Sequence, residues 1–234
     1  DGGRSSICTS LGIDQTKTDY GQHAVITNVA FEEPHLGVAF ERFTESGPLA
    51  VLPLSDFQKS NRGSLVWTVS ESSWEELLSC DEEIFRSMLT QYFGERLGRI
   101  MQIGKRVAYP LSLTLAREQV RPGLVLLGNV AHTLHPVAGQ GLNLALRDSA
   151  ALVRQLVSAK EQQVSPGEVK NLQAYLESQN QDQYESVMFT DQTVKLFSNN
   201  QWGQIAIRKL GLLGLELMPS MRSRFAQSAM GLKP

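Results

Sequence analysis

The sequence predicts a mixed fold that combines an α+β part with an α/β part, and three observations carry this prediction. Residues 24–117 are rich in β-branched segments that partly alternate between apolar and polar positions. A short, continuous apolar run, GLVLLGN, follows and leads through a glycine-bearing loop into a helical pattern. The final third of the 234 residues has helical spacing, so we expect a largely helical C-terminal region.

The β-rich region predicts an antiparallel sheet with one buried face. Its expected strands are AVITNVAF, GVAFERF, LAVLPL, SLVWTV and AYPLSLTLA, with turns at ESGP and NRGS. One helical insert interrupts the sheet. Ser73 and Glu76 have the spacing of a capping box, and DEEIFRSMLTQYFG has helical periodicity with Gly94 as its stop.

The run GLVLLGN is typical of a strand that is covered on both faces. The helix after the loop has one stripe of apolar and small residues, predicted at Leu142, Ala145, Leu146, Ser149, Val153 and Leu156. A long polar-rich helix should follow. Ser165 is its expected N-cap, Pro166 is expected in its first turn, and Glu168 is the expected acid of a capping box. The helical pattern runs from there toward Phe197.

Charge and cysteine content exclude several classes of function. The formal net charge is -2 and no block of basic residues is interleaved with aromatics, so nucleic acid is not an expected partner. Cys8 and Cys80 are too few and too far apart for a disulfide framework or a metal cluster, and they fit a reducing, cytoplasmic compartment. The chain starts at Asp1 without a signal segment, so we expect it to begin inside a longer protein.

The loop before the first long helix is suited to contact through the main chain. Gly139 and Gly141 carry no Cβ, so the backbone can approach a flat or anionic ligand closely. Asn143 lies in the expected first helical turn, where its amide can donate and accept, and the positive helix end favours negative charge. The alternative is a tight turn without a ligand, and these residues alone do not decide between the two.

His132 and His135 have H-x-x-H spacing, which raises the possibility of a metal site. No third ligand lies nearby in the sequence, and Pro136 disfavours helical geometry at His135, so a hydrogen-bonded structural histidine is the better interpretation of each. We therefore predict no metal. Arg147 and Asp148 are interpreted as surface charge, although an acid near a helix start also suits the helix dipole.

Two segments resemble one enzyme family. The run GNVAHTLHPVAGQGLNLALRDSAAL is similar to the second flavin-binding motif of the class A flavoprotein aromatic hydroxylases, which share the p-hydroxybenzoate hydroxylase fold. DGGRSS, at residues 1–6, resembles the family's Asp-Gly motif, which serves both FAD and NAD(P)H. The match is closest to the ubiquinone-biosynthesis branch, and there to hydroxylases of polyprenylated methoxyphenols, through RFTESGPLAVLPLSD, the loop and TDQTVKLFSNNQW.

The resemblance implies a cofactor site. Asn129 stands where most of the family has an Asp that holds the flavin ribityl hydroxyls, and its amide can still form hydrogen bonds without the charge. Asp1 and Gly2 would belong to the same site. The residues implied to border the isoalloxazine are Pro136, Gly139, Gln140, Gly141 and Asn143.

The family's first motif, a strand with G-x-G-x-x-G and a helix that binds the FAD adenosine half, does not occur in this sequence. The resemblance therefore implies a C-terminal portion of such an enzyme. Its expected parts are the end of an FAD-domain segment (1–20), a β-sheet substrate domain (21–118), an FAD-domain strand, loop and helix (119–160), and C-terminal helices (161–234).

By the same resemblance, NAD(P)H reduces FAD, and O2 provides the oxygen that is transferred to a polyprenylated methoxyphenol ring in ubiquinone biosynthesis. No catalytic acid or base is implied. Two alternatives stay open. One is a sister ring hydroxylase or another flavoprotein of the same fold, and the other is a non-catalytic interaction module that docks to proteins of a quinone-synthesis complex.

A membrane-soluble substrate draws attention to residues 201–225, QWGQIAIRKLGLLGLELMPSMRSRF. This segment is too short and too charged to span a bilayer, but flanking tryptophan and basic residues are typical of an interfacial helix. The alternative is a helix packed on its own domain or on a partner subunit. We thus expect a cytoplasmic protein with peripheral contact to the inner membrane as a hypothesis.

Overall fold

The computed structural model describes residues 2–3, 5–54, 61–197 and 223. Asp1 and, apart from residue 223, the segment 201–225 lie outside these residues. The chain divides into two compact units, each of which is considered by itself. We call Tyr20–Leu111 with Lys195–Ala206 the sheet unit, and Asp1–Asp19, Ser112–Val194 and Ile207–Pro234 the helical unit.

The predicted antiparallel sheet is confirmed. Its strands are β1 (Gln15–Phe31), β2 (Phe40–Thr44), β3 (Gly47–Pro53), β4 (Arg62–Ser70), β5 (Ile100–Ile103), β6 (Val107–Ala116) and β9 (His132–Thr133). They follow the order β2-β3-β4-β1-β6-β9, and β5 also pairs with β1. Several details differ from the sequence prediction. Strand β1 begins at Gln15 and not at residue 24, and β2 begins at Phe40 and not at residue 37. Residues 47–48 of ESGP and 62–63 of NRGS belong to strands and not to turns, and β5 and β9 were not predicted.

The sheet unit has its core on one face of these strands. Val25 of β1 pairs with Trp67 of β4, which in turn pairs with Leu49 of β3, so alternate positions of three strands meet in one layer. Helices α2 (Trp74–Ser79) and α3 (Glu82–Phe93) cover this layer, and α3 contributes Phe85 and Leu89, which have no exposed surface. The two helices therefore bury one face of the sheet.

The capping of this helical insert differs from the prediction. The Ser73 side chain makes no cap bond to α2, because its hydroxyl lies 2.9 Å from the Ser70 hydroxyl instead. A side-chain cap occurs instead at the second helix of the insert, α3. There Asp81 is the N-cap, and its Oδ1 accepts from the Ile84 N–H at 2.8 Å. The predicted stop at Gly94 is confirmed, with φ 82° and a bond from its N–H to the Thr90 carbonyl.

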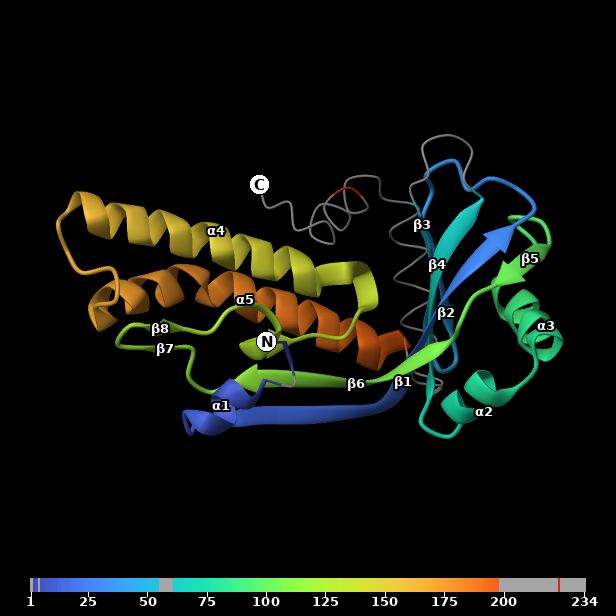
Figure 1. Cartoon of the computed structure of the whole chain (residues 1–234), viewed down its shortest axis with the longest axis horizontal. Helices are drawn as coiled ribbons and strands as arrows, with labels where there is room; N and C mark the ends of the chain where they lie inside the picture. Colours follow the sequence, from blue (N-terminus) through green and yellow to red (C-terminus); the bar gives the residue numbers. More distant parts are fainter. Residues whose placement is uncertain (1, 4, 55–60, 198–222, 224–234) are drawn as a thin grey trace. The chain divides into compact units, whose positions relative to one another are not determined.

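The helical unit contains three α-helices in the described part of the chain: α1 (Ser6–Ser10), α4 (Gln140–Glu161) and α5 (Val169–Phe197). Helices α4 and α5 lie side by side (Figure 1), joined by an ion pair between Arg147 and Asp182 and a hydrogen bond between Gln155 and Asn171. The short elements are the hairpin β7 (Val120–Arg121) and β8 (Leu124–Val125), and the 3-10 turns η1 (Gly128–Val130) and η2 (Val137–Gly139).

Two local predictions in this unit were wrong. The run GLVLLGN forms only the two-residue strand β8, because β7 is its one pairing partner in the described residues. Helix α5 starts at Val169 and not at Pro166, because the Ser165 carbonyl accepts the Glu168 N–H in a turn and helical bonding begins from Glu168. Helix α5 extends to Phe197, the last residue of this segment that the structure describes, so the predicted run toward Phe197 is confirmed.

The apolar stripe predicted for α4 is not its buried face, since three of its members are exposed and Ala145, Ser149 and Leu156 are half-buried. Leu142, Leu146 and Val153 are 71%, 59% and 58% exposed, whereas Leu144 and Asp148 are fully buried. The helix thus buries a narrow face that includes a carboxylate and leaves an apolar stripe uncovered. None of the helices in the described residues is long and apolar enough to cross a membrane.

Gly63 allows a stability test of the sheet. A Cβ on Gly63 would lie 2.7 Å from Cγ1 of the buried, stiff side chain of Val51 and 3.3 Å from the Leu52 carbonyl oxygen. We expect Gly63→Ala to lower the free energy of unfolding by about 1 to 3 kcal/mol, measured by urea denaturation followed by tryptophan fluorescence. Ser64→Ala, on the opposite face of β4, should change it by less than about 0.5 kcal/mol. An equal loss in both variants would contradict the packing argument.

Candidate cofactor site

The bend that leads into α4 requires glycine. Gly139 has φ 59° and ψ 26°, in the left-handed region, and it is the N-cap of α4. The chain therefore turns from η2 into the helix with no side chain at the turn. Because the cap residue has no side chain, the helix begins without a side-chain cap, which suits a ligand that accepts from main-chain N–H groups.

Open space lies in front of this bend. A Cβ placed on Gly139 or on Gly141 would meet no atom of the described residues within 4 Å, apart from those of the chain next to it. Pro136, before the bend in the chain, and Asn143, after it, are both exposed. Gln140 differs, because it is buried. Among the described side chains, none therefore lies against the two glycines of the tip.

Asn129 lies in η1, at the other side of the loop. Its side chain is exposed, and its carbonyl accepts a hydrogen bond from the Thr133 hydroxyl at 2.8 Å. Gly128 precedes it with φ 66°, and a Cβ at this glycine would lie 3.6 Å from the Ala145 Cβ of α4. Element η1 therefore packs against the first turns of the helix.

The N-terminal glycines meet the same loop. Gly3 lies so close to Thr133 that a Cβ on Gly3 would overlap the threonine hydroxyl. Gly2 has φ 80°, and a Cβ there would meet no neighbour within 4 Å. The two segments that carried the family resemblance, distant in the sequence, are thus neighbours within the helical unit. The sequence alone did not predict the contact between Gly3 and Thr133.

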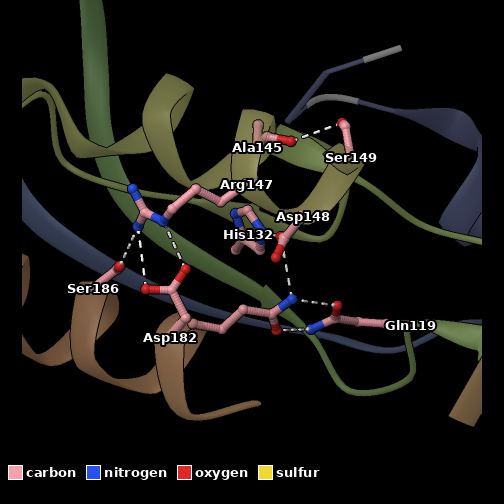
Figure 2. A network of polar contacts seen from close by, with 9 residues as sticks. Gln119, His132, Ala145, Arg147, Asp148, Ser149, Asp182 and Ser186 are labelled. Atoms are coloured by element: carbon pink, nitrogen blue, oxygen red, sulfur yellow. Dashed lines mark hydrogen bonds and ion pairs between the residues drawn. The ribbon is translucent and has the colours of Figure 1, made fainter. Parts of the chain in front are cut away.

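A buried polar network lies beneath the loop (Figure 2). His132 Nε2 and Asp148 Oδ2 are 2.7 Å apart, and both side chains are almost fully buried. Gln183 of α5 donates to the same carboxylate oxygen at 3.1 Å and bonds to Gln119 at 2.9 Å. The interpretation of Asp148 as surface charge was therefore wrong, because a partner distant in the sequence buries it.

Arg147 is also paired rather than simply solvated. Its guanidinium donates to Asp182 at 2.7 and 3.3 Å and to the Ser186 hydroxyl at 3.1 Å, all on α5 (Figure 2). Adjacent residues of α4 thus make different connections. Arg147 joins α4 to α5, whereas Asp148 joins α4 to the loop as well.

The prediction that both histidines of H-x-x-H are hydrogen-bonded structural residues is confirmed. His132 bonds to Asp148, and His135 Nδ1 accepts from the Val137 N–H at 3.1 Å. Burial lowers the pKa of His135 to about 4, so its ring is neutral at physiological pH. No group of three or more metal-binding side chains occurs in the described ranges.

This geometry fits one end of a planar cofactor. Glycines that face open space let a flat ring approach the main chain, and the start of a 22-residue helix stabilises negative charge there. A model of the FAD binding domain family matches residues 1–179. The chain belongs to this FAD-binding family.

The chain is also similar in sequence to proteins named as ubiquinone and demethoxyubiquinol hydroxylases. The chain is 38% identical over 231 residues to the protein named ubiquinone hydroxylase UbiL of Rhodospirillum rubrum, covering 99% of this chain and 53% of that protein. It is 32% identical over 232 residues to 3-demethoxyubiquinol 3-hydroxylase of Escherichia coli, covering 99% and 58%. The chain therefore spans little more than half the length of these relatives.

A solved structure extends the agreement to the fold. The anhydrotetracycline hydroxylase OxyS of Streptomyces rimosus superposes with a TM-score of 0.67 at 23% identity, over 100% of this chain and 45% of that one. At this identity the likeness concerns the fold alone. The fold is that of the FAD-dependent aromatic hydroxylases, as the resemblance implied.

His135 makes the stability of the loop depend on pH. Because its pKa is about 4 when folded and about 6.5 when unfolded, the unfolded chain binds more protons between these values. Its contribution is complete above pH 6.5 and is lost as the pH falls toward 4, by about 3 kcal/mol in all. His135→Asn keeps an acceptor for the Val137 N–H but cannot titrate in this range. We expect urea denaturation between pH 7.5 and 4 to show a shallower decline for the variant, and parallel curves would contradict this role.

Proposed function

We propose that this chain is part of a FAD-dependent monooxygenase that uses NAD(P)H and O2 to hydroxylate a polyprenylated methoxyphenol in ubiquinone biosynthesis. The observation that carries the proposal is the open, glycine-lined bend before α4, in a chain that belongs to an FAD-binding family. The names of the relatives, ubiquinone hydroxylase and 3-demethoxyubiquinol 3-hydroxylase, support the substrate class. Which ring position is hydroxylated is left to product analysis on quinone precursors.

Roles follow for the residues of the bend. Gly139 and Gly141 let the main chain meet the isoalloxazine, and the first turn of α4 stabilises negative charge at the pyrimidine end. Asn143 offers an exposed amide in that turn, and Asn129 offers one from η1 toward the ribityl chain. Bound FAD would activate O2 for the reaction, and the protein's part is to orient the rings and exclude water. Asp1 and Gly2 are proposed to complete the same site.

We further propose that another segment of the intact protein binds the adenosine half of FAD and packs on α4. The chain spans little more than half the length of its relatives, and α4 exposes Leu142, Leu146 and Val153 along one side. Apolar rows of this kind on a helix normally lie against another element. The same stripe also suits the second candidate, a non-catalytic module that docks to proteins of a quinone-synthesis complex. The proposed membrane contact through 201–225 is a separate hypothesis.

Gly141 gives a direct test of the cofactor site. Its φ is not positive and a Cβ there meets no neighbouring atom, so Gly141→Ala should leave stability unchanged or raise it by up to about 1 kcal/mol. The added methyl would project into the space proposed for the flavin. In the full-length gene product we expect the FAD dissociation constant to rise about tenfold or more, measured by flavin fluorescence.

The control for this test is Ala150→Ser, which also adds a single side-chain atom. Ala150 is an exposed residue of α4 beyond the turns that follow the bend, so the change should leave FAD affinity unchanged. A full-length protein that binds no FAD would overturn the proposed function. Unchanged affinity in Gly141→Ala would remove the bend from the cofactor site.

Leu146 tests whether another segment covers α4. Leu146→Lys should change the stability of the 234-residue chain by less than about 0.5 kcal/mol, because the side chain is exposed there. In the full-length gene product the same change should cost about 2 kcal/mol or more, because it would bury a charge. Thermal melting of both forms gives the comparison. Equal effects in the two forms would favour the docking module over a covered helix.

A further inference from the structure

We infer that Asp148 is a positioning residue for the cofactor loop: through His132 its carboxylate holds the main chain that FAD would meet, without touching FAD. This inference rests on the proposed function, and it deepens it by assigning a role to a residue beneath the bend. The observations that carry it are the buried bond between His132 and Asp148 and the place of this bond in the chain.

The bond closes the loop at its base. His132 in β9 comes before the loop, Asp148 in α4 comes after it, and η2 and the bend at Gly139 lie between them. The distance of 2.7 Å therefore joins the two ends of the segment that forms the bend. A second connection runs from the same strand, since Thr133 donates to the Asn129 carbonyl. His132 and the adjacent Thr133 are thus bonded to both sides of the candidate site.

The chemistry of the pair fixes the orientation of the imidazole. An ionised carboxylate can only accept, so the bonded Nε2 of His132 carries the proton, which sets the tautomer. The accepting oxygen of Asp148 is held in turn by the Gln183 amide, which bonds to Gln119. Because His132 and Asp148 are both buried, water does not compete for these bonds. Outer partners of this kind commonly orient the residues that contact a ligand.

Arg147, the neighbour of Asp148, forms an ion pair that does not involve the loop. Arg147 bonds to Asp182 and Ser186, so its side chain connects α4 to α5 and not to the loop. Both Arg147 and Asp148 therefore help to join the two helices, and the bond to His132 distinguishes Asp148. This difference provides a matched control on the same pair of helices.

The test compares Asp148→Asn with Asp182→Asn in the full-length gene product. In Asp148→Asn we expect the FAD dissociation constant to rise about tenfold, and the nitrogen-15 signals of the His132 ring to change from one tautomer to a mixture. In Asp182→Asn we expect a lower melting temperature, an FAD dissociation constant within about twofold of the parent protein, and an unchanged His132 ring signal.

A second pair of variants covers the case in which Asp148→Asn does not fold. His132→Gln keeps an N–H donor at similar reach and should retain FAD affinity within about threefold, whereas His132→Phe should lose about tenfold. Unchanged FAD affinity in Asp148→Asn, or equal affinities in the two His132 variants, would overturn the inference and leave the proposed function standing. A parent protein without FAD binding would overturn both.

Discussion

The buried carboxylate of Asp148 is the constraint on which the helical unit depends. A charged group without exposed surface is costly unless donors surround it, and here the donors come from His132 beside the loop and Gln183 on α5. Both donors converge on one oxygen atom, so few arrangements of the loop and the two helices can satisfy it. The rotation of α4 about its own axis follows from this, and with it the choice of the side chains that α4 buries.

The candidate site combines this fixed base with a tip that has no side chains. At the tip, Gly139 turns the chain in the left-handed region and Gly141 leaves the next stretch of main chain open. Contacts through the main chain favour a planar ligand only where the main chain is already held in place, because otherwise binding must also supply the free energy to order it. Gly3 and Thr133 add a second fixed contact on the opposite side of the loop.

Local rules predicted the features that local residues decide. Alternation of apolar residues located most strands, the stop at Gly94 was confirmed, and α5 runs as far as Phe197, as predicted. The predicted caps failed where a competing partner lay nearby, as when the Ser73 hydroxyl met that of Ser70. The loop glycines could be recognised from the sequence, but the burial of Asp148 could not, because its partner on α5 lies beyond any local pattern.

Helix α4 shows why periodicity identifies a shared face but not which face is covered. Leu142, Leu146 and Val153 do lie on one stripe, as predicted, yet that stripe is exposed and the buried face includes Asp148. Hydrophobic periodicity reports all the burial that a sequence has been selected for, including burial by segments elsewhere in an intact protein. The inner face of α4 combines the carboxylate of Asp148 with buried apolar residues such as Leu144 and Ala151, so the exposed stripe is left for another element. An apolar row on the outside of a helix that already buries another face is therefore consistent with a chain that spans little more than half of its relatives' length.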